Sequence, residues 1–206
     1  MKYIIMCGGT YSGWENTKHT QIIKGEPLIA RTIRQLREHG IDDIAISTEK
    51  SGFDKFGVPV LAHHNSYGYG GYWIEGFYPT NEPTCYIFGD VVFSDNAIKT
   101  IIDAQAEVVE FFASAPPFSC DYIKRWAEPF AVKVGDQEFF RKAIDKCRDM
   151  AGRGEFRRKP IMWELWQVIK GTPINEIDYT NYTIINDWTC DCDSEDDYKR
   201  ILEVMK

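Results

Sequence analysis

Three places in this chain of 206 residues carry side chains suited to binding a phosphorylated ligand. A glycine pair, Gly8 and Gly9, follows a short apolar run, and Lys18 comes shortly after it. Glycines there let backbone amides approach phosphate oxygens, and a lysine adds a positive charge. Carboxylates bind hard cations such as Mg²⁺. The acidic candidates are Asp90, Asp191 and Asp193. Together these residues would suit metal-assisted chemistry on a phosphate.

Each group, taken alone, also has a purely structural interpretation. The glycine pair can form a simple tight turn, and Asp90 can cap a helix. The acids near the end can cap a helix as well, because Ser194 with Asp197 fits a capping box. The glycine run is neither a dinucleotide fingerprint nor a P-loop, because it lacks Gly-x-Gly-x-x-Gly and Gly-Lys-Ser/Thr.

The elements that must position these residues follow from the hydrophobic pattern. Short β-rich runs predict strands at residues 3–6, 44–48, 58–61, 85–88, 108–113, 130–134 and 182–185. Helical spacing predicts helices at 28–39, 97–106, 137–150, 161–170 and 196–205. Residues 65–83 form a loop or a short helix. Strands that alternate with helices predict one α/β domain, a three-layer α/β/α arrangement around a mostly parallel, Rossmann-like sheet. Ligands bind at the carboxyl ends of such strands, where all three candidate groups fall.

Composition narrows the class of protein. Hydrophobic residues make up 44% and charged residues 27%, as in ordinary globular proteins, and the net charge of −7 argues against a nucleic-acid surface. The sequence has no run approaching the roughly 18 apolar residues of a membrane span, and its opening run is too short for a signal-peptide core. We therefore expect a cytoplasmic protein with no membrane partner. The six cysteines are scattered and are expected to be buried free thiols.

The run from residue 3 to residue 48 resembles the N-terminus of the sugar-phosphate and phosphoalcohol nucleotidyltransferases. That family shows an apolar strand, a glycine loop, a lysine and a Gly-Lys-Pro-Leu-Ile-like segment; here these are residues 4–10, Lys18 and residues 25–29. Residues 88–94, Gly-Asp-Val-Val-Phe-Ser after a phenylalanine, resemble its metal-binding segment, and residues 187–197 resemble its closing acidic stretch. The chain departs from the family in lacking an arginine between Gly8 and Lys18 and in having Thr17 where a proline is usual.

The resemblance implies a Mg²⁺-dependent nucleotidyltransferase of the nucleotide-diphospho-sugar transferase fold type. It would transfer a nucleotide monophosphate from a nucleoside triphosphate to a small phosphorylated acceptor, as in the supply of cell-surface polysaccharide precursors. Chain size and the double-aspartate ending favour CTP. Residues 1–113 would bind the nucleotide, residues 114–206 would bind the acceptor and close the metal site, and the protein could form a homodimer. The implied nucleotide-binding residues are Cys7, Gly8, Gly9, Thr10, Tyr11 and Ser12, the catalytic residue is Lys18, and the metal ligands are Asp90, Asp191 and Asp193.

The acceptor and two rival functions stay open from sequence alone. Tyr67, Tyr69 and Trp73 could line an acceptor site or simply pack a loop on the sheet, and Lys133 could contact an acceptor phosphate. A glycosyltransferase using a nucleotide-sugar would normally carry a mid-chain Asp-x-Asp, whereas residue 92 is valine. A non-catalytic nucleotide-binding module is the third possibility, favoured by the missing loop arginine.

Overall fold

A computed structural model describes residues 1–8, 18–63, 71–116 and 127–205. In these residues seven strands form one sheet in the order β10-β8-β9-β6-β1-β4-β5. The strands are β1 (Lys2–Met6), β4 (Ile44–Thr48), β5 (Val60–Ala62), β6 (Thr84–Phe88), β8 (Val109–Ser114), β9 (Pro129–Val134) and β10 (Thr183–Ile185). Only β9 runs antiparallel to its neighbours, so the prediction of a mostly parallel sheet is confirmed.

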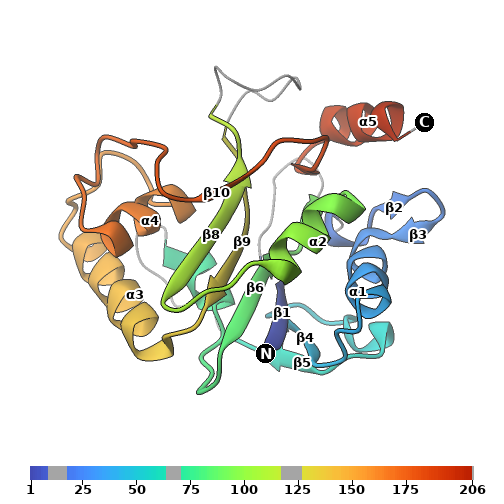
Figure 1. The fold of residues 1–206 in the computed structure, drawn as a ribbon, viewed down its shortest axis with the longest axis horizontal. Helices are drawn as coiled ribbons and strands as arrows, with labels where there is room; N and C mark the ends of the chain where they lie inside the picture. The colour runs from blue at the N-terminus through green and yellow to red at the C-terminus, as the bar shows by residue number, and fades with distance from the viewer. Residues whose placement is uncertain (9–17, 64–70, 117–126, 206) are drawn as a thin grey trace.

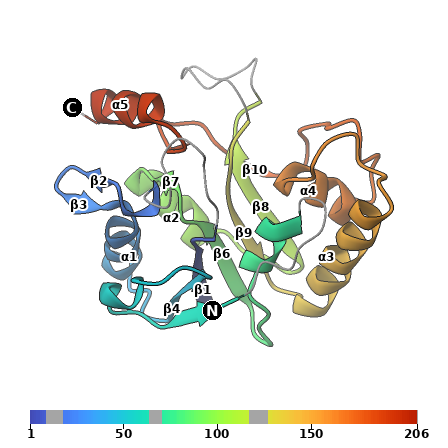
Figure 2. The same ribbon diagram turned by 180° about the vertical axis from the view of Figure 1, so that it is seen from behind.

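Helices cover both faces of this sheet (Figures 1 and 2). One face carries α1 (Leu28–Glu38) and α2 (Asp95–Asp103), and the other carries α3 (Gln137–Gly152) and α4 (Met162–Lys170). The last helix, α5 (Glu195–Val204), lies beside a small hairpin of β2 (Ile22–Ile23) and β3 (Glu26–Pro27). The described residues also form three short 3₁₀ helices: η1 (Lys18–Thr20), η2 (Asp54–Phe56) and η3 (Gly71–Gly76).

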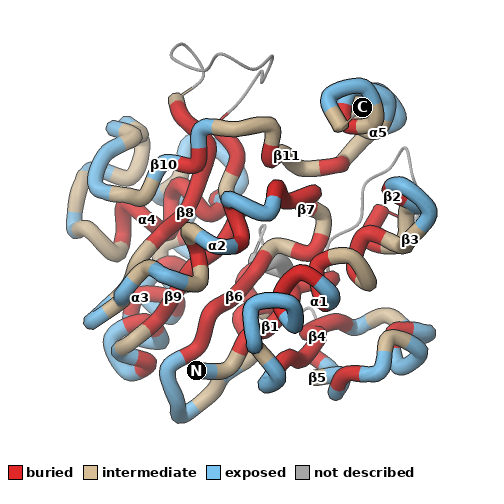
Figure 3. Tube along the Cα trace, turned by 45° about the vertical axis from the view of Figure 1, so that its right-hand side comes forward, coloured by how far each residue is buried: buried red, intermediate tan, exposed pale blue. Residues whose placement is uncertain are grey.

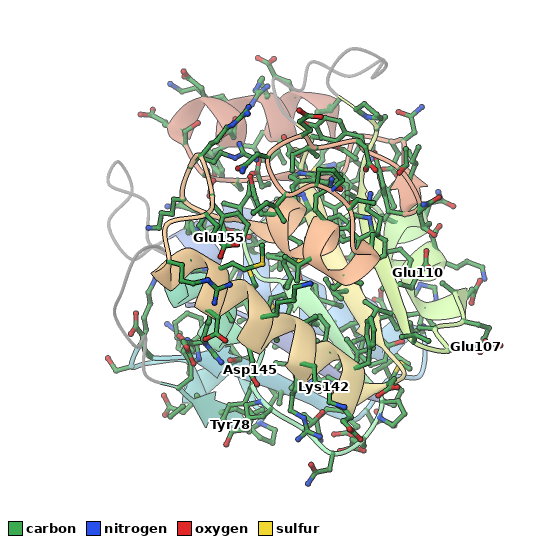
Figure 4. The ribbon with its side chains drawn as sticks, turned by 90° about the vertical axis from the view of Figure 1, so that its left-hand side faces the viewer. Tyr78, Glu107, Glu110, Lys142, Asp145 and Glu155 are labelled. Carbon is green, nitrogen blue, oxygen red and sulfur yellow. The ribbon has the colours of Figure 1, made fainter. Side chains whose placement is uncertain are left out.

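Alternation along β1 explains the three layers. Side chains of a strand point to opposite faces in turn. Tyr3 and Ile5 belong to the core shared with α1 and α2, whereas Ile4 and Met6 belong to the core shared with α3 and α4. The central strands are buried along most of their length, while the outer faces of the helices are exposed (Figure 3). Figure 4 shows the outer face of α3, where Lys142 and Asp145 point to solvent.

The predicted helix at 97–106 is shifted in the structure, and both shifts have a local cause. Ser94 caps α2 two residues earlier than expected, because its side chain accepts a hydrogen bond from the backbone N–H of Ala97. The helix ends at Asp103, where the ammonium of Lys133 takes up its last carbonyls. The remaining predicted strands and helices agree with the observed elements to within about two residues at each end.

The end of the chain returns to its middle through a second small sheet. Strand β11 (Cys190–Asp191) pairs antiparallel with β7 (Val91–Val92), and the backbone N–H of Cys192 donates to the carbonyl of Asp90 at 2.8 Å. A separate apolar cluster supports this pairing and joins it to β2, α1 and α5; its buried members are Ile23, Leu28, Val92, Cys192 and Ile201. Residues near 90 and near 193 are therefore held side by side.

Among the described residues, none of the helices has both the length and the apolar character that crossing a membrane requires.

Gly89 stands where the turn after β6 touches the end of β1. A Cβ at this position would lie 2.5 Å from the Sγ of Cys7 and 2.6 Å from the carbonyl oxygen of Met6, and the latter is backbone that cannot move aside cheaply. We predict that Gly89→Ala lowers the free energy of unfolding by about 1–3 kcal/mol, measured by urea denaturation.

Gly152 is the matched control for this substitution. It ends α3, and a Cβ there would meet nothing within 4 Å. Gly152→Ala should leave stability unchanged or raise it by up to about 1 kcal/mol. Equal stability of the two variants would contradict the close packing at Gly89.

Candidate active site

The ammonium of Lys18 joins two carboxylates from distant parts of the chain. Its Nζ donates to Oδ2 of Asp90 at 2.5 Å and to Oδ1 of Asp193 at 2.8 Å. The Lys18 side chain is 8% exposed, and the carboxylates are 21% and 37% exposed, so the group is screened from solvent on the lysine side and open on the acid side. The structure thus brings together three of the residues that the sequence singled out.

Each of the three is positioned by a different element. Lys18 begins η1, which packs on α1. Asp90 occupies the turn between β6 and β7, at the carboxyl end of a central strand, as the sequence predicted. Asp193 follows β11, just before α5. Ser194 caps that helix by accepting from the backbone N–H of Asp197, so the capping prediction is confirmed while Asp193 remains directed at Lys18.

Charge and burial act in opposite directions at this group. Burial, the largest influence, would raise the pKa of Asp90. The charge of Lys18, together with His19 and hydrogen bonds from Lys18 and the backbone, outweighs burial and holds that pKa below its usual value. Burial and then the charge of Asp90 raise the pKa of Asp193, against the opposing effect of Lys18. Burial would lower the pKa of Lys18, yet the two carboxylates raise it above its usual value. The lysine is therefore a firmly charged cation between acids.

Asp191 lies beside this group but has a different neighbour. Its backbone N–H donates to Oε2 of Glu128 at 3.2 Å, and Glu128 is itself buried just before β9. Burial, followed by the charges of Glu128 and Asp193, raises the pKa of Asp191 well above its usual value. Glu128 was not singled out from the sequence, although its position as a lone acid directly ahead of an apolar strand was an available signal.

The donor set fits a single Mg²⁺ held by two carboxylates. In residues 1–8, 18–63, 71–116 and 127–205, no set of three or more His, Cys, Asp or Glu side chains is arranged to hold a metal ion. Mg²⁺ nevertheless is commonly bound through one or two carboxylates, with waters and substrate phosphates completing its shell. Asp90 and Asp193 meet that requirement because one oxygen of each already approaches the same nitrogen.

The end of β1 forms the second part of the site. Cys7 is fully buried; its backbone N–H donates to the carbonyl of Ser47 at 2.8 Å, and its carbonyl accepts from Oγ1 of Thr48 at 3.0 Å. Burial raises the pKa of the Cys7 thiol well above its usual value, so the side chain belongs to the core. A Cβ on Gly8 would lie 2.9 Å from Nε2 of His63, so any larger residue here would require the His63 ring to shift.

Polar residues on β4 and after β5 contact the end of β1, and they were not singled out from the sequence. Nδ1 of His63 and the hydroxyl of Ser47 are 3.0 Å apart, so the two side chains are hydrogen-bonded. Thr48 links the carbonyl of Cys7 to the backbone N–H of Lys50. Ser47 and Thr48 lie at the carboxyl end of β4, where ligands bind in such sheets, and this position was the signal that could have identified them.

Several predicted residues cannot be placed. Gly9, Thr10, Tyr11, Ser12, Tyr67 and Tyr69 lie outside the described residues. Trp73 belongs to η3, and its side chain lies outside the described part.

Lys133 has a structural role in place of the expected contact with an acceptor phosphate. Its Nζ donates to the carbonyls of Ile101, Ile102 and Ala104 at 2.9, 2.8 and 2.7 Å, which uses all three of its hydrogens. In the sheet, Lys133 on β9 lies opposite Cys85, near the start of β6, whereas Asp90 follows the end of β6. The prediction is corrected because Lys133 closes the end of α2, at the end of the strands opposite to Asp90.

With the geometry established, the chain can be compared with known proteins. No known family profile matches it, and no curated protein sequence does. Among solved structures it is similar to a Bacillus anthracis protein assigned as a glucose-1-phosphate thymidylyltransferase, with 16% identity, 99% of this chain and 94% of the other covered, and a TM-score of 0.64.

Two cytidine-nucleotide proteins are also similar in structure. CTP:phosphocholine cytidylyltransferase from Streptococcus pneumoniae gives 20% identity, coverage of 100% and 99%, and a TM-score of 0.55. CMP:2-keto-3-deoxy-manno-octonic acid synthetase in complex with CTP gives 13% identity, coverage of 99% and 97%, and a TM-score of 0.59. The chain therefore has the fold of the nucleotidyltransferases, along nearly its full length, and the predicted fold class is confirmed.

Lys133 generates a prediction about stability. Lys133→Met keeps most of the side chain's length but leaves three carbonyls without their donor. We expect the free energy of unfolding to fall by about 2–3 kcal/mol in urea denaturation. Lys142→Met on the exposed face of α3 is the control and should change stability by less than about 0.5 kcal/mol. A stable Lys133 variant would show that the cap on α2 is unimportant.

His19 generates a prediction about pH. It is 1% exposed, its ring meets that of Phe53 edge-on at 6.2 Å, and burial lowers its pKa to about 3. The charge of Asp90 opposes this shift, and those of Lys18 and Lys50 add to it. The unfolded chain, with a histidine pKa of about 6.5, binds the proton more readily, so stability present at neutral pH is lost as the pH falls from about 6.5 toward 3.

We expect His19→Gln to remove part of this pH dependence. In urea denaturation between pH 7 and pH 4, the wild type should lose up to about 1.4 kcal/mol per pH unit more than the variant. His39→Gln, at the exposed end of α1, is the control and should follow the wild type. Identical slopes for wild type and His19→Gln would contradict the burial of a neutral imidazole.

Proposed function

We propose that this protein is a Mg²⁺-dependent nucleotidyltransferase that transfers a nucleotide monophosphate, with CTP as the favoured donor, to a small phosphorylated metabolite. The observation that carries the proposal is the meeting of Lys18, Asp90 and Asp193 at the carboxyl ends of the strands. The end of β1, with Gly8, belongs to the same edge of the sheet. A lysine, two acids and a glycine there are the groups that a metal-bound triphosphate needs.

In the proposed reaction, an oxygen of the acceptor phosphate attacks the α-phosphorus of the triphosphate. A new P–O bond forms, the bond to the β-phosphate oxygen breaks, and pyrophosphate leaves. The nucleophile is already ionised at neutral pH, so no general base is required. Alignment and charge neutralisation are what the site must provide.

Different residues would provide the alignment and the charge neutralisation. Backbone amides from Gly8 onward would bind the triphosphate, and Lys18 would neutralise charge near the α-phosphate. Asp90 and Asp193 would hold Mg²⁺, which when bound neutralises the charge of the phosphates. Asp191 would serve as a further ligand or orient the pair through its neighbour Glu128.

CTP is favoured by the double-aspartate ending and by the size of the chain. Two of the similar structures carry cytidine nucleotides in their names, and each is covered over nearly all of its length. We assign residues 1–113 to the nucleotide and residues 114–206 to the acceptor and the closing metal motif. The acceptor is a phosphorylated alcohol, amine or sugar.

The direct test incubates the protein with each of the four nucleoside triphosphates, Mg²⁺ and a panel of phosphorylated metabolites. We expect pyrophosphate release with at least one acceptor, and fastest with CTP. Asp90→Asn and Asp193→Asn should each lower kcat/KM by at least about 100-fold, because each removes a charge that binds the metal. Asp103→Asn at the exposed end of α2 is the control and should retain activity.

Two results would contradict the proposal. Release of free nucleoside diphosphate from a nucleotide-sugar would indicate a glycosyltransferase. Mg²⁺-dependent nucleotide binding by calorimetry, without pyrophosphate from any pairing, would indicate a non-catalytic module.

A further inference from the structure

Lys18 stands at the point that a shared divalent cation would need. Its nitrogen is 2.5 Å from Oδ2 of Asp90 and 2.8 Å from Oδ1 of Asp193. A Mg²⁺ bound by the same two oxygens would lie about 2.0–2.1 Å from each. The ammonium and the metal ion therefore need nearly the same space and the same lone pairs, and two cations that close together repel each other strongly.

We infer that Lys18 and the divalent cation are alternative partners of Asp90 and Asp193, and that they exchange when the metal-bound nucleotide arrives. Without nucleotide, the ammonium holds the two carboxylates together. When the metal takes the carboxylates, Lys18 is released to the phosphates of the nucleotide. This inference rests on the proposed function, because it states when Lys18 becomes free to contact the nucleotide.

The backbone around Lys18 is built to stay in place during such an exchange. The next residue, His19, is buried against Phe53, and the carbonyl of Gln21 accepts from the backbone N–H of Leu28 at 2.8 Å. These contacts fix η1 against the start of α1. Only the flexible four-carbon stem of the lysine has to rotate, which a lysine side chain does readily.

The two carboxylates are destabilised whenever no cation lies between them. They are partly buried, and they come from parts of the chain that are otherwise far apart in sequence. Left without a cation they would repel each other and strain the contact between β7 and β11. Lys18 therefore preserves the metal site while no metal is bound, and it also makes that site a poor one for free metal ions.

The exchange is tested by measuring Mn²⁺ binding to the protein without nucleotide, using the EPR signal of free Mn²⁺. The wild type should bind weakly. Lys18→Met, which removes the competing charge at similar length, should bind Mn²⁺ at least about tenfold more tightly. Lys99→Met removes the same charge from an exposed ion pair with Asp103 on α2, and it should bind like the wild type.

A second readout uses the wild-type protein only. Reductive methylation of Lys18, followed by mass spectrometry of its peptide, should become faster when saturating Mn²⁺ displaces the ammonium from the acids. Lys18→Gln replaces Lys18→Met if thermal melting shows that the methionine variant does not fold.

The outcomes separate this inference from the proposed function. Mn²⁺ affinity in both Lys18 variants equal to or weaker than the wild type, or a methylation rate unchanged by Mn²⁺, overturns the exchange even if pyrophosphate release is intact. Absence of Mn²⁺ binding in every protein, with and without CTP, overturns the metal role and the proposed function together.

Discussion

The candidate site depends on one constraint: two carboxylates that repel each other must be held within reach of a single cation. Asp90 and Asp193 come from the middle and the end of the chain, and the pairing of β7 with β11 places them together. The ammonium of Lys18 makes this arrangement stable by contacting both. Without a cation between the two carboxylates, their repulsion would favour detachment of the C-terminal segment from the sheet.

The C-terminal segment is attached by apolar and polar contacts to the N-terminal part of the chain. Ile201 of α5 packs with Ile23 and Val92, and the hydroxyl of Tyr198 donates to the carbonyl of Ile22 at 3.0 Å. Ile22 and Ile23 belong to the β2–β3 hairpin, which connects Lys18 in η1 to α1. The site is thus assembled from both ends of the chain and exists only after the last helix has docked.

The fold alone leaves the chemistry open, because similar structures carry names with different nucleotides and acceptors. The charges around the candidate site are local features of this chain. It has no arginine between Gly8 and Lys18, so Lys18 is the single cationic side chain in that stretch. Glu128 adds a buried acid beside Asp191. The proposed ligand therefore rests on these local charges and not on the fold alone.

The secondary-structure elements and the types of residue at their ends could be predicted from the sequence. Alternation in β1 and helical spacing in α1 are local properties of a chain, so they could be predicted without coordinates. The roles of Lys133, Glu128 and His19 could not, since burial and neighbouring charge depend on segments distant in sequence. Lys133 resembled a phosphate ligand until three carbonyls of α2 were seen to surround it. The bridge from Lys18 to Asp90 and Asp193 is visible only in the folded chain, because only folding brings their charges within contact distance.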